Sequence, residues 1–267
     1  MTQDEPEIIK QYLLRTGVGV DYLNNHLAPV LSGSTYEVKF ASVFIHQKPT
    51  VTRTATSQSA HPSANKRCEL GDMLVVFCLI DVHKNPLYTS AVILQAKKKD
   101  HMPAGAQQFL YEHDLDFNMP ANLYRKSAIR SALRLLPDYP HDRTKALHYL
   151  ILDGSPFTRT IPWATSIQHG WDDFLFRVLI GSLGRRFASV TKPTIPNWTC
   201  IIRDLIDVGK VLLPSRAPRG SNLLGVINLF NDFTDCHEYS QVIEGQEYQG
   251  LPTLYVIVRD KEEQQKR

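Results

Sequence analysis

Two apolar runs separated by a short turn are the strongest structural signal in this sequence. The first covers residues 73–80 (MLVVFCLI) and the second residues 90–96 (SAVILQA), with the turn-prone segment HKNP at residues 83–86 between them. Continuous apolar runs of this length, rich in Val, Ile, Leu and Phe, are typical of strands that are covered on both faces. The pattern predicts an antiparallel hairpin in the centre of a sheet.

Polar side chains stand at one end of this hairpin. Asp72 precedes the first strand, and Gln95 and Lys97 close the second. The start of one antiparallel strand lies beside the end of its partner, and residues two apart point to the same face of a sheet. We therefore expect Asp72, Gln95 and Lys97 to meet at one edge, with Gly71 leaving room near the carboxylate.

The Gln-x-Lys spacing is weak by itself, because an acid or Gln two residues before Lys also occurs at Glu37 and Gln264. Only Gln95 closes an apolar strand whose preceding neighbour begins with an acid. A Gln and lysines at a strand end are also typical of a solvated edge that discourages aggregation, and spacing leaves that alternative open.

Further elements are predicted on both sides of the hairpin. Apolar periodicity indicates helices over residues 5–15, 20–31 and 104–113 and strands over residues 36–45 and 146–153. Residues 47–66 are rich in Thr, Ser, Ala and Pro, which predicts a long mobile loop that leads into the hairpin.

The order of these elements and the Gly-Asp and Gln-x-Lys motifs resemble the PD-(D/E)XK nuclease superfamily, in the variant with Gln that is found in Mrr-like endonucleases. The resemblance covers roughly residues 1–153. It implies an α/β, restriction-endonuclease-like core with a central mixed four-stranded sheet flanked by helices, which we assign to residues 1–155. The chain departs from the family pattern in lacking a Pro before Asp72 and in having the neutral Gln95 for the second acid.

The resemblance implies a metal-dependent phosphodiesterase site. Asp72 would be the principal ligand of Mg²⁺ or Mn²⁺, and Gln95 would add its amide oxygen. Lys97 would orient the attacking water or hold the phosphate, because its ordinary pKa makes it a poor base at neutral pH. Glu69 is a further catalytic and metal-ligand candidate that would restore the missing charge if the chain bends at Gly71.

Two residues are accessory candidates. His46 closes the strand before the hairpin, and Glu7 lies on the first helix. A structural or solvent-facing role is the alternative for both.

Nucleic acid, above all double-stranded DNA, is the partner that a nuclease fold implies. The net charge of only +3 requires a local basic patch. One candidate is Lys98 and Lys99 beside the site. The other is a stripe of Lys126, Arg130 and Arg134, four residues apart on a predicted helix, for which an ordinary solvated face is the alternative.

Residues 156–267 carry less chemical signal. They contain amphipathic helical patterns near residues 170–187 and 198–213 and a strand pattern, TLYVIVRD, which together predict an α-rich C-terminal extension packed on the core. The four cysteines show no C-x-x-C spacing, and no apolar run approaches the length of a membrane span, so we expect a cytoplasmic protein without a membrane segment.

The sequence thus predicts a metal-dependent DNA endonuclease. Such nucleases often serve prokaryotic defence against phage or foreign DNA, as homodimers or as subunits of a defence complex, which is an implication of the resemblance. The rival hypothesis is a catalytically inactive nuclease fold that binds nucleic acid or a partner protein, and the neutral Gln95 favours it. An unrelated interaction domain with a charged hairpin edge is the third hypothesis.

Overall fold

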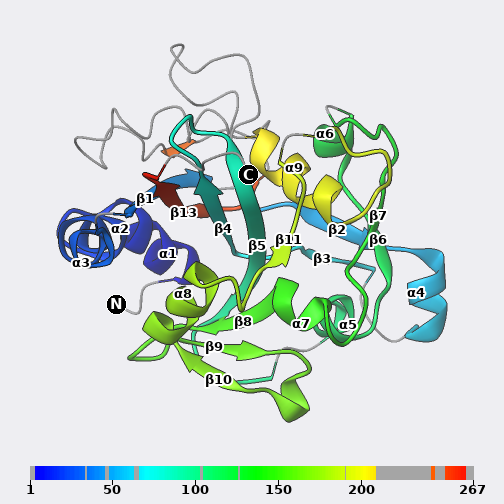
Figure 1. Cartoon of the computed structure of the whole chain (residues 1–267). Helices are drawn as coiled ribbons and strands as arrows, with labels where there is room; N and C mark the ends of the chain where they lie inside the picture. The colour runs from blue at the N-terminus through cyan, green and yellow to red at the C-terminus, as the bar shows by residue number, and fades with distance from the viewer. Residues whose placement is uncertain are drawn as a thin grey trace.

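The computed structural model describes residues 4–33, 35–45, 48–62, 66–102, 105–125, 127–189, 191–208, 242–243 and 250–262. The protein is mixed α/β, with one large mixed sheet and one small antiparallel sheet (Figure 1). The strands of the large sheet are β1 (Tyr36–Ile45), β4 (Met73–Ile80), β5 (Pro86–Lys97), β8 (Leu147–Ile151), β9 (Phe157–Thr160), β10 (Gln168–Gly170), β11 (Arg185–Arg186), β12 (Val242–Ile243) and β13 (Thr253–Asp260). The small sheet consists of β2 (Thr50–Arg53), β3 (Arg67–Glu69), β6 (Asp116–Asn118) and β7 (Leu133–Leu135).

Helices cover both faces of the large sheet. The helical elements of the described chain are α1 (Glu5–Leu14), α2 (Gly19–Tyr22), the π-helical turn η1 (Leu23–Leu27), α3 (Ala28–Leu31), α4 (Ala55–Ala60), α5 (Ala106–Glu112), α6 (Ala121–Tyr124), α7 (Arg143–Ala146), the 3₁₀ turn η2 (Trp163–Thr165), α8 (Trp171–Leu179) and α9 (Trp198–Val208). In Figure 1, α1 to α3 and α8 lie on one side of the sheet, and α6, α9 and the small sheet lie on the other.

The predicted hairpin of β4 and β5 is confirmed, and both of its faces are buried. Leu74 and Val76 of β4 belong to the core beneath the small sheet, whereas Met73 and Val75 belong to the core beneath α1 and α8. The period of two explains this division, because successive side chains of a strand point to opposite faces. The predicted strands at residues 36–45 and 146–153 and the helices at 5–15, 20–31 and 104–113 are also present.

The sheet is larger than the predicted four strands. Its order is β10-β9-β8-β5-β4-β13-β1-β12, with β11 paired to β5. β13 lies between β1 and β4, antiparallel to β1 and parallel to β4. The four-strand prediction was wrong because apolar periodicity identifies single strands but does not show which of them join the same sheet.

The predicted α-rich C-terminal extension is not found among the described residues. Beyond residue 155 the chain supplies β9, β10, β11, β12 and β13 to the large sheet, and α8 and α9 pack against its two faces. Strands from both sides of residue 155 therefore share one sheet. The strand predicted from TLYVIVRD is confirmed as β13.

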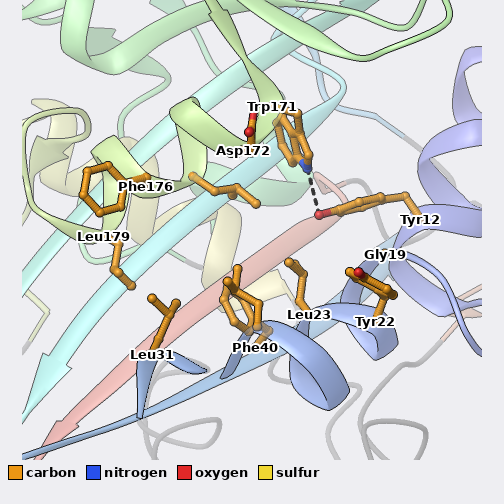
Figure 2. Close-up of a pocket in the computed structure, with 12 residues that line it drawn as sticks. Tyr12, Gly19, Tyr22, Leu23, Leu31, Phe40, Trp171, Asp172, Phe176 and Leu179 are labelled. Atoms are coloured by element: carbon orange, nitrogen blue, oxygen red, sulfur yellow. Dashed lines mark hydrogen bonds between the residues drawn. The ribbon is translucent and has the colours of Figure 1, made fainter. Parts of the chain in front are cut away.

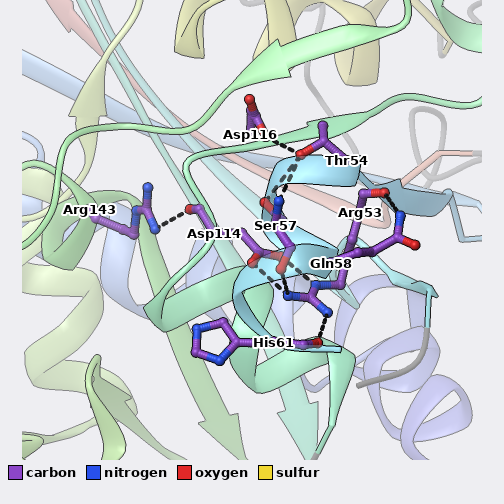
Figure 3. Close-up of polar contacts among 8 residues, drawn as sticks. All are labelled: Arg53, Thr54, Ser57, Gln58, His61, Asp114, Asp116 and Arg143. Atoms are coloured by element: carbon purple, nitrogen blue, oxygen red, sulfur yellow. Dashed lines mark hydrogen bonds and ion pairs between the residues drawn. The ribbon is translucent and has the colours of Figure 1, made fainter. Parts of the chain in front are cut away.

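Residues 47–66 do not form the predicted long loop in their described part, which contains β2 and α4. An ion pair between two fully buried side chains explains the order. Arg53 donates from Nε and Nη2 to Asp114 at 2.7 and 2.9 Å, and Nη2 also donates to the Ser57 carbonyl at 2.8 Å (Figure 3). Thr54 caps α4 at Ser57 and donates to Asp116 at 2.6 Å. The pair of Arg53 and Asp114, which lie 61 residues apart in the sequence, therefore orders this segment. Local periodicity does not predict such a pair.

A buried histidine in β8 makes stability depend on pH. The Nε2 of His148 lies 2.8 Å from the Thr144 carbonyl, and Nδ1 has no partner among the described residues. Burial lowers the pKa of His148 to about 4, so the folded chain keeps it neutral where the unfolded chain, with a pKa of about 6.5, becomes protonated.

We therefore expect the contribution of His148 to the unfolding free energy to be complete above about pH 6.5 and to decrease as the pH falls toward 4. The loss is about 2 kcal/mol at pH 5. Urea unfolding of the wild type and of His148→Leu at pH 7.5 and 5.0 measures it. Equal losses in both proteins between these pH values would contradict the assignment.

Candidate active site

The hairpin register places Asp72 against the end of β5. Met73 pairs with Leu94, and the Asp72 amide donates to the Leu94 carbonyl at 2.8 Å. Gly71 permits this approach, because a Cβ at that position would lie 2.5 Å from Cγ2 of Ile93. The chain therefore enters β4 tightly packed on β5, with Asp72 beside Gln95.

Asp72 is fully buried, and both of its carboxylate oxygens are engaged. Oδ2 accepts from the Ala96 amide at 2.7 Å and from the Gln95 side-chain amide. Oδ1 contacts the ammonium of Lys48. The side chain is thus held in one orientation by β5 on one side and by a cation on the other.

Lys48 is the main residue of this site that sequence reasoning missed. It lies in the segment between β1 and β2, and its ammonium also contacts Oε2 of Glu69 at 3.4 Å. Burial alone would lower the pKa of Lys48, but the charges and hydrogen bonds of Asp72 and Glu69 outweigh it and raise the pKa above its ordinary value. Lys48 is therefore a permanent cation between two carboxylates.

The available signal for Lys48 was its position just after a predicted buried strand. Val43 of β1 pairs with Thr253, which pairs in turn with Leu74, so the end of β1 and the start of β4 lie at the same edge of the sheet. His46, the candidate proposed on that argument, lies outside the described residues.

Glu69 and Asp72 belong to different sheets. Glu69 ends β3 and pairs with Thr50, whereas Asp72 leads into β4. The chain crosses from one sheet to the other through Leu70 and Gly71, so both carboxylates reach Lys48. The Glu69 side chain is 44% exposed and the Asp72 side chain 1%. The site has a carboxylate open to solvent above a buried one.

Gln95 and Lys97 lie on the same face of β5, as alternation predicts. Gln95 is buried, and its Oε1 has no hydrogen-bond partner among the described residues. Lys97 is half-buried and donates to Oε1 of Gln107 in α5 at 3.0 Å. Gln95 therefore offers an unused acceptor beside Asp72, and α5 holds Lys97 on the same face.

Lys98 and Lys99 follow on the same strand end. The Lys98 amide donates to Glu5 at 2.9 Å, and its ammonium pairs with Asp4 at 3.3 Å, which ties the start of α1 to this edge. Lys99 is exposed. Glu7 is also exposed, and it accepts a hydrogen bond from Gln11 within α1, so the structure does not bring it to the site.

The predicted basic stripe is wrong in its geometry. The chain forms β7, not a helix, at Arg134, which is fully buried and donates to Asp204 of α9 at 2.7 Å. Arg130 is exposed, and Lys126 lies outside the described residues. Because Arg134 is an internal ion-pair partner, it has no free face to offer to DNA.

Comparisons with models of known protein families, with curated proteins and with solved structures found no match to this chain. Within the described residues, no three His, Cys, Asp or Glu side chains gather closely enough to hold a metal. Any cation site here combines Asp72 and Glu69 with the neutral oxygen of Gln95.

No helix in the described part of the chain has the length and apolarity needed to cross a bilayer.

Proposed function

We propose that this chain is a metal-dependent DNA endonuclease whose site consists of Asp72, Glu69, Gln95 and Lys97. The supporting observation is the buried Oε1 of Gln95, which has no hydrogen-bond partner in the described part of the chain although Gln95 contacts the Asp72 carboxylate. A buried acceptor without a donor is costly, and a bound cation would remove that cost. On the family resemblance we also propose double-stranded DNA as the substrate and a role in defence. The same resemblance suggests assembly as a homodimer or as a subunit of a defence complex.

The donor set fits Mg²⁺ or Mn²⁺ in its chemistry, since it consists of two carboxylates and one amide oxygen. The ammonium of Lys48 already makes the contacts with Asp72 and Glu69 that a divalent cation would make. Metal binding in this proposal requires Lys48 to leave the carboxylates. When bound, such a cation polarises a phosphate oxygen and activates water.

The residues of the chain then have separate roles. Asp72 and Glu69 provide the negative charge, and Gln95 adds an oxygen without charge. Lys97, held by Gln107 at 3.0 Å, positions the phosphate or the attacking water as a point charge. Lys48, once released, would be a second cation that can attract the phosphate backbone.

The second candidate function is a nuclease fold without catalysis that binds nucleic acid or a partner protein. The pairing of Lys48 with both carboxylates favours it, because the ammonium neutralises the charge that a metal needs. The two functions differ in whether a divalent cation displaces Lys48.

Cleavage of supercoiled plasmid in Mg²⁺ or Mn²⁺ tests the proposal. We expect the wild type to nick the plasmid and Lys97→Ala to be slower by about 10²-fold, because it loses the positioning ammonium. Lys192→Ala removes an exposed lysine outside the proposed site and is the control, expected to keep the wild-type rate.

Equal cleavage by the wild type and Lys97→Ala would rule out the assigned role of Lys97. Absence of cleavage in both metals, together with DNA binding that weakens as salt rises, would instead support the non-catalytic candidate.

A further inference from the structure

A cavity lies on the opposite face of the large sheet from Asp72. Its volume is about 400 Å³, and it lies between α1, the α2-η1-α3 segment, β1 and α8 (Figure 2). Its walls are apolar, with aromatic rings contributed by Tyr12, Tyr22, Phe40, Trp171 and Phe176 and the rest mainly by leucines. The volume is within the range of sites that hold small organic ligands.

The backbone around this cavity is unusual in two places. Leu23 and Leu27, which line it, open and close the π-helical turn η1, a form of helix that is rare and often found at functional sites. Gly19 has a positive φ of +51°, and a Cβ there would lie 1.7 Å from the Tyr12 carbonyl oxygen. The contact between α1 and α2 that shapes this wall therefore requires glycine.

The Tyr12 hydroxyl is a polar group among these apolar walls. The Tyr12 hydroxyl accepts a hydrogen bond from Nε1 of Trp171 at 2.8 Å, which leaves its own proton available for donation. Burial raises the pKa of Tyr12, so the hydroxyl stays neutral, although the bond from Trp171 opposes the shift. Figure 2 shows this pair at one end of the cavity and Leu31, Phe176 and Leu179 at the other.

The carboxylate of Asp172, at the rim of the cavity, points away from the leucines that line it (Figure 2). Oδ1 of Asp172 lies 2.8 Å from the position that a Cβ of Gly170 would take, at the N-terminus of α8. A charged ligand would lose its hydration against these mainly apolar walls.

The geometry points to a binding site for an uncharged, mostly apolar small molecule with one hydrogen-bond acceptor. The apolar body fills the space between the leucines and Phe40, and the acceptor, a carbonyl or ether oxygen, takes the proton of Tyr12. This site stands independently of the proposed nuclease site, because it uses the other face of the sheet and none of the same residues.

A fluorescent ketone tests the inference. 2-Acetyl-6-(dimethylamino)naphthalene is uncharged, and its emission shifts with polarity and with hydrogen bonding to its carbonyl. We expect saturable binding of one molecule per wild-type chain. Leu31→Trp, which fills the cavity from α3, is expected to weaken binding by at least about tenfold. Tyr12→Phe is expected to weaken it by about fivefold and to shift the bound emission to the blue, because one neutral hydrogen bond is lost.

Val30→Trp is the matched control for the cavity-filling change. Val30 is the neighbour of Leu31 in α3, is 79% exposed and does not line the cavity, so this variant is expected to bind like the wild type. Circular dichroism verifies the fold of each variant, and the emission shift in Tyr12→Phe is a second readout that does not depend on Leu31→Trp.

Three results would overturn the inference. The first is non-saturable binding of the probe by the wild type, and the second is equal binding by Leu31→Trp and Val30→Trp. The third is a wild-type dimer in sedimentation that does not bind the probe and that the Leu31→Trp substitution dissociates. The last result would identify the cavity as a self-association surface.

Discussion

Lys48→Met is expected to lower the unfolding free energy by about 3–5 kcal/mol, and added Mg²⁺ is expected to restore part of that loss. The reason is the burial of Asp72, whose side chain is 1% exposed and whose Oδ1 contacts the Lys48 ammonium. Methionine keeps most of the volume of Lys48 but leaves that carboxylate without its cation. A divalent cation that binds only the folded state, at a free concentration of 100 times its Kd, would raise the unfolding free energy by about 2.7 kcal/mol.

Urea unfolding with and without Mg²⁺ measures both effects. Lys98→Met is the matched control, because it removes the same charge from a pair with Asp4 in which the side chains are 39% and 87% exposed. Such a pair contributes at most about 1 kcal/mol. If Mg²⁺ leaves the unfolding free energy of Lys48→Met unchanged, Asp72 and Glu69 do not form a cation site, and the non-catalytic candidate gains support.

Arg134→Met is expected to cost about 3–5 kcal/mol of unfolding free energy. Arg134 is fully buried and donates to Asp204 of α9 at 2.7 Å and to the carbonyls of Ser131 and Leu133 at 2.6 and 2.7 Å. The substitution leaves the Asp204 carboxylate buried without its principal cation.

Arg130→Met, four residues earlier and exposed, is the control for Arg134→Met and is expected to change stability by less than about 0.5 kcal/mol. Adding Asp204→Leu to Arg134→Met is expected to recover part of the loss, because it removes the buried carboxylate that has lost Arg134. Equal stability of Arg134→Met and the wild type in urea unfolding would show that the pair is not held in solution.

The sequence predicted those elements that local periodicity determines. The hairpin of β4 and β5, the strands β1, β8 and β13 and the helix α1 follow from the spacing of their apolar residues. The approach of Asp72 to Gln95 followed from the geometry of antiparallel pairing. These features depend only on residues that are close in the sequence or that pair across one hairpin turn.

The missed features depend on contacts between distant segments. Arg134 has the four-residue spacing of a helix face, but its partner Asp204 lies 70 residues away. Lys48 reaches Asp72 because β1 ends at the edge of the large sheet where β4 begins, an arrangement that polar composition does not indicate. The order of β1, β13 and β4 likewise depends on packing of the entire sheet.

The place of β13 has a consequence for the timing of assembly during protein synthesis. β13 fills the gap between β1 and β4, and the Leu74 amide donates to the Pro252 carbonyl at 2.8 Å, two residues beyond Asp72. A nascent chain that has not yet released residues 253–260 from the ribosome lacks the neighbour of β4 on that side. The edge that carries Asp72 is therefore completed only after residues 253–260 have left the ribosome, and shorter nascent chains do not contain the finished site.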